Sequence, residues 1–252
     1  MGDLLIDIGN TRIKWARLEQ GTVQPQSASP HADWTAQTFI DRVGRASVDA
    51  QRVLVSNVAG PRMAQVIRAG LAQAGHVEPE FVTSTATAGG VRNAYSQPAQ
   101  LGVDRWLAII GAHALERGPV CVVSVGTALT IDGVDANGRH LGGVIVPGPD
   151  LMVSTLLQNT SDIAQRAEQG TTSDGFFADN TLGAIQQGAE HAAAALVERA
   201  VTAMRQQLKE TPKLLLTGGA SARLEKSLAL PRRLIPDLVL QGLAVLASQS
   251  RR

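Results

Sequence analysis

Two short polar motifs, each following an apolar run, contain side chains that could bind phosphate. Asp7-Ile-Gly-Asn-Thr11 follows Leu4-Leu-Ile6, and Ser124-Val-Gly-Thr127 follows Val120-Cys-Val-Val123. In each motif the glycine lets a ligand approach the backbone, and neighbouring N–H groups and Asn or Thr side chains can donate to phosphate oxygens. Either motif alone is more typical of an ordinary hairpin than of a phosphate site. Their pairing favours phosphate binding, because two facing halves would aim both turns into one cleft.

Two carboxylates next to apolar segments are candidates for catalysis. Asp7 ends an apolar strand, where a structural carboxylate is uncommon, and holding Mg²⁺ directly or through water would explain it. Asp104 precedes the apolar run 106–115, and its position by itself favours a helix-capping role. Arg105 either clamps a substrate carboxylate or pairs with a surface acid.

The remaining glycine-rich segments predict turns. They are Gly142-Gly143 with Pro147-Gly148, and Thr217-Gly218-Gly219. Neither segment matches a P-loop or a GxGxxG fingerprint, so neither supports a Walker or Rossmann interpretation.

The elements that position these motifs occur twice. Strands are expected at 4–8, 11–15 and 52–56, with helices at about 33–48, 63–71 and 106–115. A second series follows, with strands at 120–125, 129–132, 140–146 and from 214, and a long helix at 180–208. The segments around Asp7 and Ser124 share one scheme of strand, glycine and polar residue. The pattern predicts an α/β protein of two similar βββαβα halves, at 1–117 and 118–252.

Composition excludes several classes of protein and of partner. The 252 residues include 23 Lys and Arg against 22 Asp and Glu, without a basic stripe, so nucleic acid is not an expected partner. No apolar run approaches the roughly 18 residues of a membrane span, and Asp3 and Asp7 stand where a secretory signal would be basic. We therefore expect a cytoplasmic protein without membrane partners. The single Cys121, within an apolar run, predicts a buried, inert thiol.

Four motifs occur in order: Asp7-x-Gly-Asn-Thr11, Gly102-x-Asp-Arg105, Gly126-Thr-Ala-x-Thr-x-Asp132 and Gly142-Gly-x-Ile-x-Pro-Gly148. Over nearly the whole chain they resemble type III pantothenate kinase, also known as the Bvg accessory factor-like family. The resemblance implies the fold of the acetate and sugar kinase, Hsp70 and actin superfamily. It also implies a homodimeric cytoplasmic enzyme that uses ATP to phosphorylate pantothenate to 4′-phosphopantothenate, the first step of coenzyme A synthesis.

The resemblance also assigns roles to residues. Asp104 would accept the proton of the substrate hydroxyl. The implied contacts of the ATP phosphates are Asp7, Ile8, Gly9, Asn10, Thr11, Arg12, Ile13, Lys14 and Thr127. The implied pantothenate contacts are Tyr95, Gly102, Val103, Asp104, Arg105 and Thr181. These roles suit phosphoryl transfer, which depends mostly on alignment and charge neutralisation.

One position departs from the family pattern. Members commonly carry an aspartate just before the second Gly-Thr turn as a ligand of a monovalent cation, K⁺ or NH₄⁺, and this chain has Ser124 there. The departure weakens the expectation of a cation site. The apolar helices at 106–115 and 180–208 would supply either a dimer contact or the core. Two alternative functions remain, a non-catalytic nucleotide-binding regulator and a kinase of another small hydroxyl compound.

Overall fold

The computed structural model describes residues 2–75, 78–168, 170–171 and 175–249. The chain forms two compact units, one of Met1–Arg117, Val134–Gly142 and Asp237–Arg252, the other of Gly118–Gly133 and Gly143–Pro236. The first unit contains β1 (Gly2–Ile8), β2 (Arg12–Glu19), β3 (Thr22–Val23), β4 (Ser27–Pro30), α1 (Ala36–Ser47), β5 (Ala50–Asn57), α2 (Pro61–Gln73), β6 (Glu80–Phe81), β7 (Thr87–Ala88), β8 (Val91–Arg92), a 3₁₀ turn (Pro98–Gln100), α3 (Val103–Leu115) and α8 (Leu238–Gln249).

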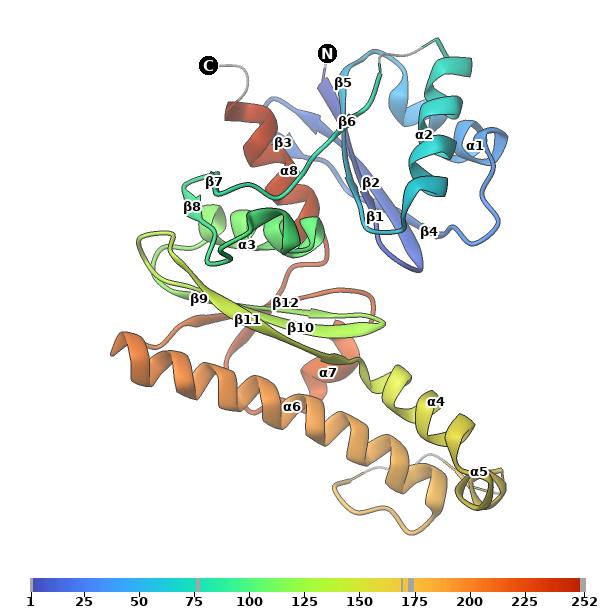
Figure 1. Cartoon of the computed structure of the whole chain (residues 1–252), viewed down its shortest axis with the longest axis vertical. Helices are drawn as coiled ribbons and strands as arrows, with labels where there is room; N and C mark the ends of the chain where they lie inside the picture. Colours follow the sequence, from blue (N-terminus) through green and yellow to red (C-terminus); the bar gives the residue numbers. More distant parts are fainter. Residues whose placement is uncertain (1, 76–77, 169, 172–174, 250–252) are drawn as a thin grey trace. The chain divides into compact units, whose positions relative to one another are not determined.

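The sheet of the first unit has the order β3-β2-β1-β5-β6, with β4 paired to β2. Strand β1 runs antiparallel to β2 and parallel to β5. Alternate residues of β1 enter two cores, since successive side chains of a strand point to opposite faces. Leu4, Ile6 and Ile8 pack with α1 and α2, whereas Leu5 packs with α3 and α8. Figure 1 shows α1 and α2 on one side of this sheet and α8 on the other.

The second unit repeats the strand order. Its sheet, β11-β10-β9-β12-β13, corresponds strand for strand to β3-β2-β1-β5-β6. The elements are β9 (Val120–Val125), β10 (Ala128–Val134), β11 (His140–Pro147), α4 (Pro149–Asn159), α5 (Ser161–Ala167), α6 (Thr181–Leu208), β12 (Lys213–Thr217), α7 (Ser221–Lys226) and β13 (Arg232–Leu234). The last residue of β10 and the first three residues of β11 are grouped with the first unit. In Figure 1 the long helix α6 runs alongside the sheet of this unit. Its buried residues include Ala193, Val197 and Val201. The expected duplication is therefore present.

Helix α8 belongs to the first unit, although the expected boundary places its residues in the second half. The reason is its close packing on α3. A Cβ at Gly111 of α3 would lie 2.6 Å from the Leu238 carbonyl oxygen, and a Cβ at Gly242 of α8 would lie 2.0 Å from that of Leu107. Only glycine permits this approach at both positions.

Helix α3 is a core helix. Its residues from Arg105 to Ala112 are all buried, and Leu107, Ile109 and Ile110 belong to apolar clusters of the first unit. Of the two roles considered for this helix, the core role is the one observed. No helix among the described residues is long and apolar enough to cross a membrane.

Candidate active site

The alternation of β1 places Asp7 on the face of the sheet that packs against α3. Asp7 is in register with Lys14 of β2 and with Ser56 of β5. Asp7 lies two residues after Leu5, so both side chains point to the same face of the sheet. Leu5 packs on that face with Leu107 of α3. The side chain is only 7% exposed, and its Oδ1 has no hydrogen-bond partner among the described residues. A buried acceptor without a donor fits a position that binds a cation.

The electrostatic surroundings of Asp7 differ from those of a surface carboxylate. Burial raises the pKa of Asp7 from 3.8 to about 6, against the positive charge of Lys14, which lowers it. The charge of Asp104 raises the pKa and the Ser56 hydroxyl lowers it. The structure therefore brings these two predicted site residues near enough for the charge of one to affect the pKa of the other.

Asp104 lies inside the first turn of α3. The N-cap residue is Gly102, which makes no side-chain capping bond, so the expectation that Asp104 caps this helix is wrong. Asp104 Oδ1 accepts a hydrogen bond from the Arg105 N–H at 2.8 Å, and a carboxylate in a first turn is favoured by the helix dipole. A Cβ at Gly102 would lie 2.8 Å from Asp104 Oδ1, so glycine leaves space for this carboxylate.

Arg105 and Tyr95 form a second pair of predicted site residues. Arg105 Nη1 donates to Tyr95 Oη at 3.2 Å, and the guanidinium lies 5.9 Å from the centre of the Tyr95 ring. The Tyr95 ring stacks on that of His140, with centroids 6.2 Å apart and planes 10° apart. Val103, between Gly102 and Asp104, is partly buried against the core around Leu107. Tyr95 therefore contacts Arg105 through both its hydroxyl and its ring.

The turn that follows β1 exposes Asn10, Thr11 and Arg12, whereas Ile8 and Ile13 are fully buried in the core. Any contact of Ile8 or Ile13 with a nucleotide would use the backbone. The Gly9 N–H donates to the Arg12 carbonyl at 3.0 Å and closes the turn.

In the second unit, three glycine segments meet at the end of β9. Thr127 is exposed in the turn between β9 and β10, and its carbonyl accepts from the Gly148 N–H at 2.8 Å. A Cβ at Gly148 would lie 2.1 Å from the Gly126 oxygen, and one at Gly218, where φ is +94°, would lie 2.3 Å from the Val125 oxygen. From the sequence, Gly148 and Gly218 were predicted to lie in separate turns. Their proximity to the turn at Gly126 could not be predicted, because it arises only in the folded sheet.

Two further predicted residues also lie in the second unit. Ser124 is the fifth residue of β9, in register with Thr217 of β12. Thr181 is the first residue of α6, directly after the N-cap Asn180, whose side chain accepts from the Gly183 N–H at 2.9 Å. Among the described residues, no three His, Cys, Asp or Glu side chains gather to hold a metal ion.

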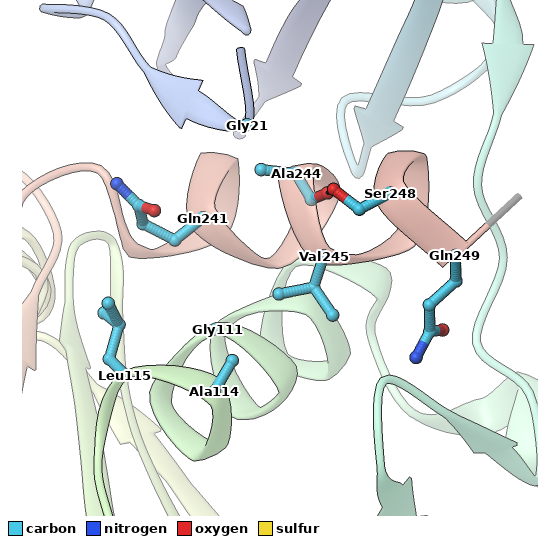
Figure 2. Close-up of a pocket in the computed structure, with 9 residues that line it drawn as sticks. All are labelled: Gly21, Gly111, Ala114, Leu115, Gln241, Ala244, Val245, Ser248 and Gln249. Carbon is cyan, nitrogen blue, oxygen red and sulfur yellow. The ribbon is translucent and has the colours of Figure 1, made fainter. Parts of the chain in front are cut away.

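A cavity of about 380 Å³ between α3 and α8 lacks the chemistry of a reaction site. Figure 2 shows Gln241, Ser248 and Gln249 of α8 around it. Gln241 Nε2 donates to Asp237 Oδ2 at 2.6 Å, Ser248 Oγ donates to the Ala244 carbonyl, and Gln249 Oε1 accepts from the Gly89 N–H. These groups already have partners within the chain, so the acidic pair Asp7 and Asp104 remains the candidate reaction centre.

A family model and the sequences of known relatives both match this chain over most of its length. The family model described as type III pantothenate kinase matches residues 3–203. A relative of that name from Herminiimonas arsenicoxydans is 41% identical over 250 residues, 97% of this chain and 96% of the relative. Another from Nitrosococcus oceani is 36% identical over 254 residues, 99% of this chain and 95% of the relative.

Two solved structures bear on the fold alone. A Campylobacter jejuni protein assigned to the Baf family of transcriptional activators gives a TM-score of 0.60 at 22% identity, covering 98% of each chain. A Sinorhizobium meliloti protein assigned as 2-dehydro-3-deoxygalactonokinase gives 0.55 at 16%, covering 99% of this chain and 96% of that one. With the repeated strand order, these likenesses confirm the predicted α/β fold class.

Proposed function

The chain belongs to the type III pantothenate kinase family, and on that premise we propose how its residues carry out the reaction. The activity is ATP-dependent phosphorylation of pantothenate, which yields 4′-phosphopantothenate in the first step of coenzyme A biosynthesis. The observation that carries the residue assignment is the interaction of Asp7 with Asp104. It supports the proposal because two acidic groups of one unit lie near each other, and one could bind a metal while the other accepts the substrate proton.

Asp104 is the proton acceptor in this proposal. The primary hydroxyl oxygen of pantothenate attacks the γ-phosphorus of ATP, its proton passes to the Asp104 carboxylate, and the bond from the γ-phosphorus to the β–γ bridging oxygen breaks to release ADP. The residue lies in the first turn of α3 and is only partly buried. These features suit a base that meets a substrate.

Asp7 is the proposed Mg²⁺ ligand, directly or through water. Magnesium typically binds one or two carboxylates together with substrate phosphates and water, so a three-residue cluster is not required. When bound, the ion neutralises charge on the phosphates. The nearby Lys14 and the exposed turn from Asn10 to Arg12 are the proposed phosphate contacts of the first unit, and Thr127 is that of the second.

Arg105 is proposed to bind the pantothenate carboxylate, with Tyr95 fixing the guanidinium through its hydroxyl and ring. Gly102 and Val103 would contact the same substrate through the backbone at the start of α3. Thr181 is proposed as a further pantothenate contact, on the basis of the family pattern.

The proposal extends to a homodimer working in the cytoplasm, where ATP is available. Exposed apolar side chains of the second unit support association with a second copy; they are Val144, Ile145, Leu151, Leu156, Phe176 and Phe177. Sedimentation of the native chain and of Ile145→Asp tests this, since a dimer using this surface should dissociate in the variant. An active native monomer at assay concentration would contradict it.

The decisive experiment couples ADP release to a spectroscopic readout, with and without pantothenate, and identifies the product by mass. We expect ADP release that depends on pantothenate and one added phosphoryl group on it. Turnover with a sugar or acetate but not pantothenate would instead indicate another small-molecule kinase. ATP binding without product would indicate a nucleotide-binding regulator; neither alternative is favoured by the family's curated members.

A further inference from the structure

His31, directly after β4, bonds to the turn that follows β1 at two points. The imidazole Nε2 lies 2.6 Å from the Gly9 carbonyl oxygen, and the backbone N–H donates to the Thr11 carbonyl at 3.4 Å. The residue is 5% exposed. Because β4 pairs with β2 through Arg12 and Pro30, His31 reaches the turn from a separate strand. The turn is therefore held from outside as well as by its own Gly9–Arg12 bond.

The bond to Gly9 fixes the orientation of a peptide group. A carbonyl oxygen only accepts, so the hydrogen of this bond must lie on His31 Nε2. The Gly9 carbonyl and the Asn10 N–H belong to the same trans peptide unit and point in opposite directions. With the carbonyl held toward His31, the Asn10 N–H points away from it. Asn10 is exposed, and among the described residues its N–H donates to no other backbone group.

We propose that His31 is a positioning residue for nucleotide binding, which holds the Gly9–Asn10 peptide with its N–H toward the phosphates of bound ATP. The inference rests on the proposed function, in which this turn contacts ATP. Gly9 has no Cβ to oppose rotation of the peptide, so without the histidine bond the group can turn over. A turned peptide would present the Gly9 carbonyl to the phosphates, and two sets of partially negative oxygens repel each other.

A matched pair of variants separates the hydrogen bond from the volume of the side chain. His31→Gln retains an N–H donor at similar reach, whereas His31→Met has similar length and no donor. We expect His31→Met to raise the Kd for MgATP by about fivefold to tenfold, the effect of losing one ordinary buried hydrogen bond. His31→Gln should recover most of this loss, and the KM for pantothenate should change in neither. Ser29→Ala is the control, because Ser29 is also buried near the end of β4, and its hydroxyl donates to the Pro30 carbonyl instead of to the turn that follows β1.

Calorimetric titration of MgATP, without pantothenate, gives the Kd values, and thermal unfolding of the same samples shows whether each variant folds. Wild-type affinity in a folded His31→Met would overturn the proposal. So would equal weakening in His31→Met and His31→Gln, or equal rises in Kd for ATP and KM for pantothenate, since each indicates a role in general stability alone. Because the titration needs no phosphoryl transfer, a wild-type protein that binds ATP but leaves pantothenate unchanged would refute the proposed function and still test His31.

Discussion

The carboxylate of Asp7 on β1 and that of Asp104 in the first turn of α3 lie close enough for the charge of Asp104 to raise the pKa of Asp7. The two groups have different surroundings, since Asp7 is buried and Asp104 is partly open to solvent. The buried Asp7 carboxylate is therefore suited to binding a cation, and the more exposed Asp104 carboxylate is suited to contacting a substrate hydroxyl.

Asp104→Asn should lower kcat by about 10²- to 10⁴-fold and leave the Kd for MgATP close to that of the native protein. Asparagine keeps the shape of the side chain but cannot accept the substrate proton, and general-base assistance has that typical magnitude. Steady-state kinetics and calorimetry measure both. Asp33→Asn, an exposed substitution in the same unit, is the control. Near-native turnover of Asp104→Asn at saturating pantothenate would refute the assigned role.

Asp7→Asn should make the protein more stable and less active. Raising the Asp7 pKa from 3.8 to about 6 corresponds to about 3 kcal/mol against the ionised form, an upper figure for the gain because the new amide is buried too. We expect a higher melting temperature for the variant at pH 8 without Mg²⁺. With ATP present, adding Mg²⁺ should stabilise the native protein and not the variant. Equal stabilisation of both by Mg²⁺ would show that Asp7 holds no metal.

Arg105→Lys should raise the KM for pantothenate about tenfold or more, with little change in the KM for ATP. Lysine keeps the charge but loses the planar fork and the stacking on Tyr95. Initial-rate measurements with each substrate varied in turn test this. Arg92→Lys, an exposed arginine nearby in sequence, should leave both constants unchanged. A parallel rise in both KM values after Arg105→Lys would count against a specific pantothenate contact.

Activation by K⁺ or NH₄⁺ should require a higher concentration than an anionic ligand would allow, and Ser124→Asp should lower that concentration. A carboxylate attracts a cation at ~4 Å by about 4 kcal/mol at an effective dielectric of ~20, an upper guide because desolvation of the ion opposes it. The assay titrates turnover against KCl, with NaCl holding ionic strength constant. Saturation at low K⁺, unchanged in Ser124→Asp, would show that this position does not govern the cation.

Cys121 should not react with a disulfide reagent at pH 8 in the native protein. Burial, with a smaller effect of Asp132, raises the pKa of its thiol from 9.0 to about 12. Well below pH 9 the thiol is protonated in the folded and in the unfolded chain, and its full contribution to the stability of the folded protein is present. As pH rises from 9 toward 12 the unfolded thiol ionises first, so the free energy of unfolding falls. Denaturant titrations at pH 8 and 10.5 measure this fall. From pH 8 to pH 10.5 the free energy of unfolding should decrease less for Cys121→Ala than for the native protein. Rapid labelling of the folded chain would contradict this.

The strands and helices that carry the polar motifs, and their repetition, could be predicted from the amino-acid sequence, whereas helices such as α4, α5 and α8 were not predicted. Apolar runs, glycine turns and helical periodicity are local signals, and they predicted the strands around Asp7 and Ser124 and helices close to α1, α2, α3 and α6. The two-fold scheme of strand, glycine and polar residue was readable for the same reason. The four ordered motifs identified the family, since their types and spacing are properties of the chain alone.

Which of these residues lie near one another depends on how the layers pack in three dimensions. Asp7 lies near Asp104 because the alternation of side chains along β1 points Asp7 to the face of the sheet that α3 covers. No local sequence pattern specifies which helix covers which face. The same holds for His31 at Gly9, for Gly148 and Gly218 at the end of β9, and for α8 on α3. Each contact joins segments distant in sequence, and packing of whole layers, which lowers the free energy by burying apolar surface, selects it.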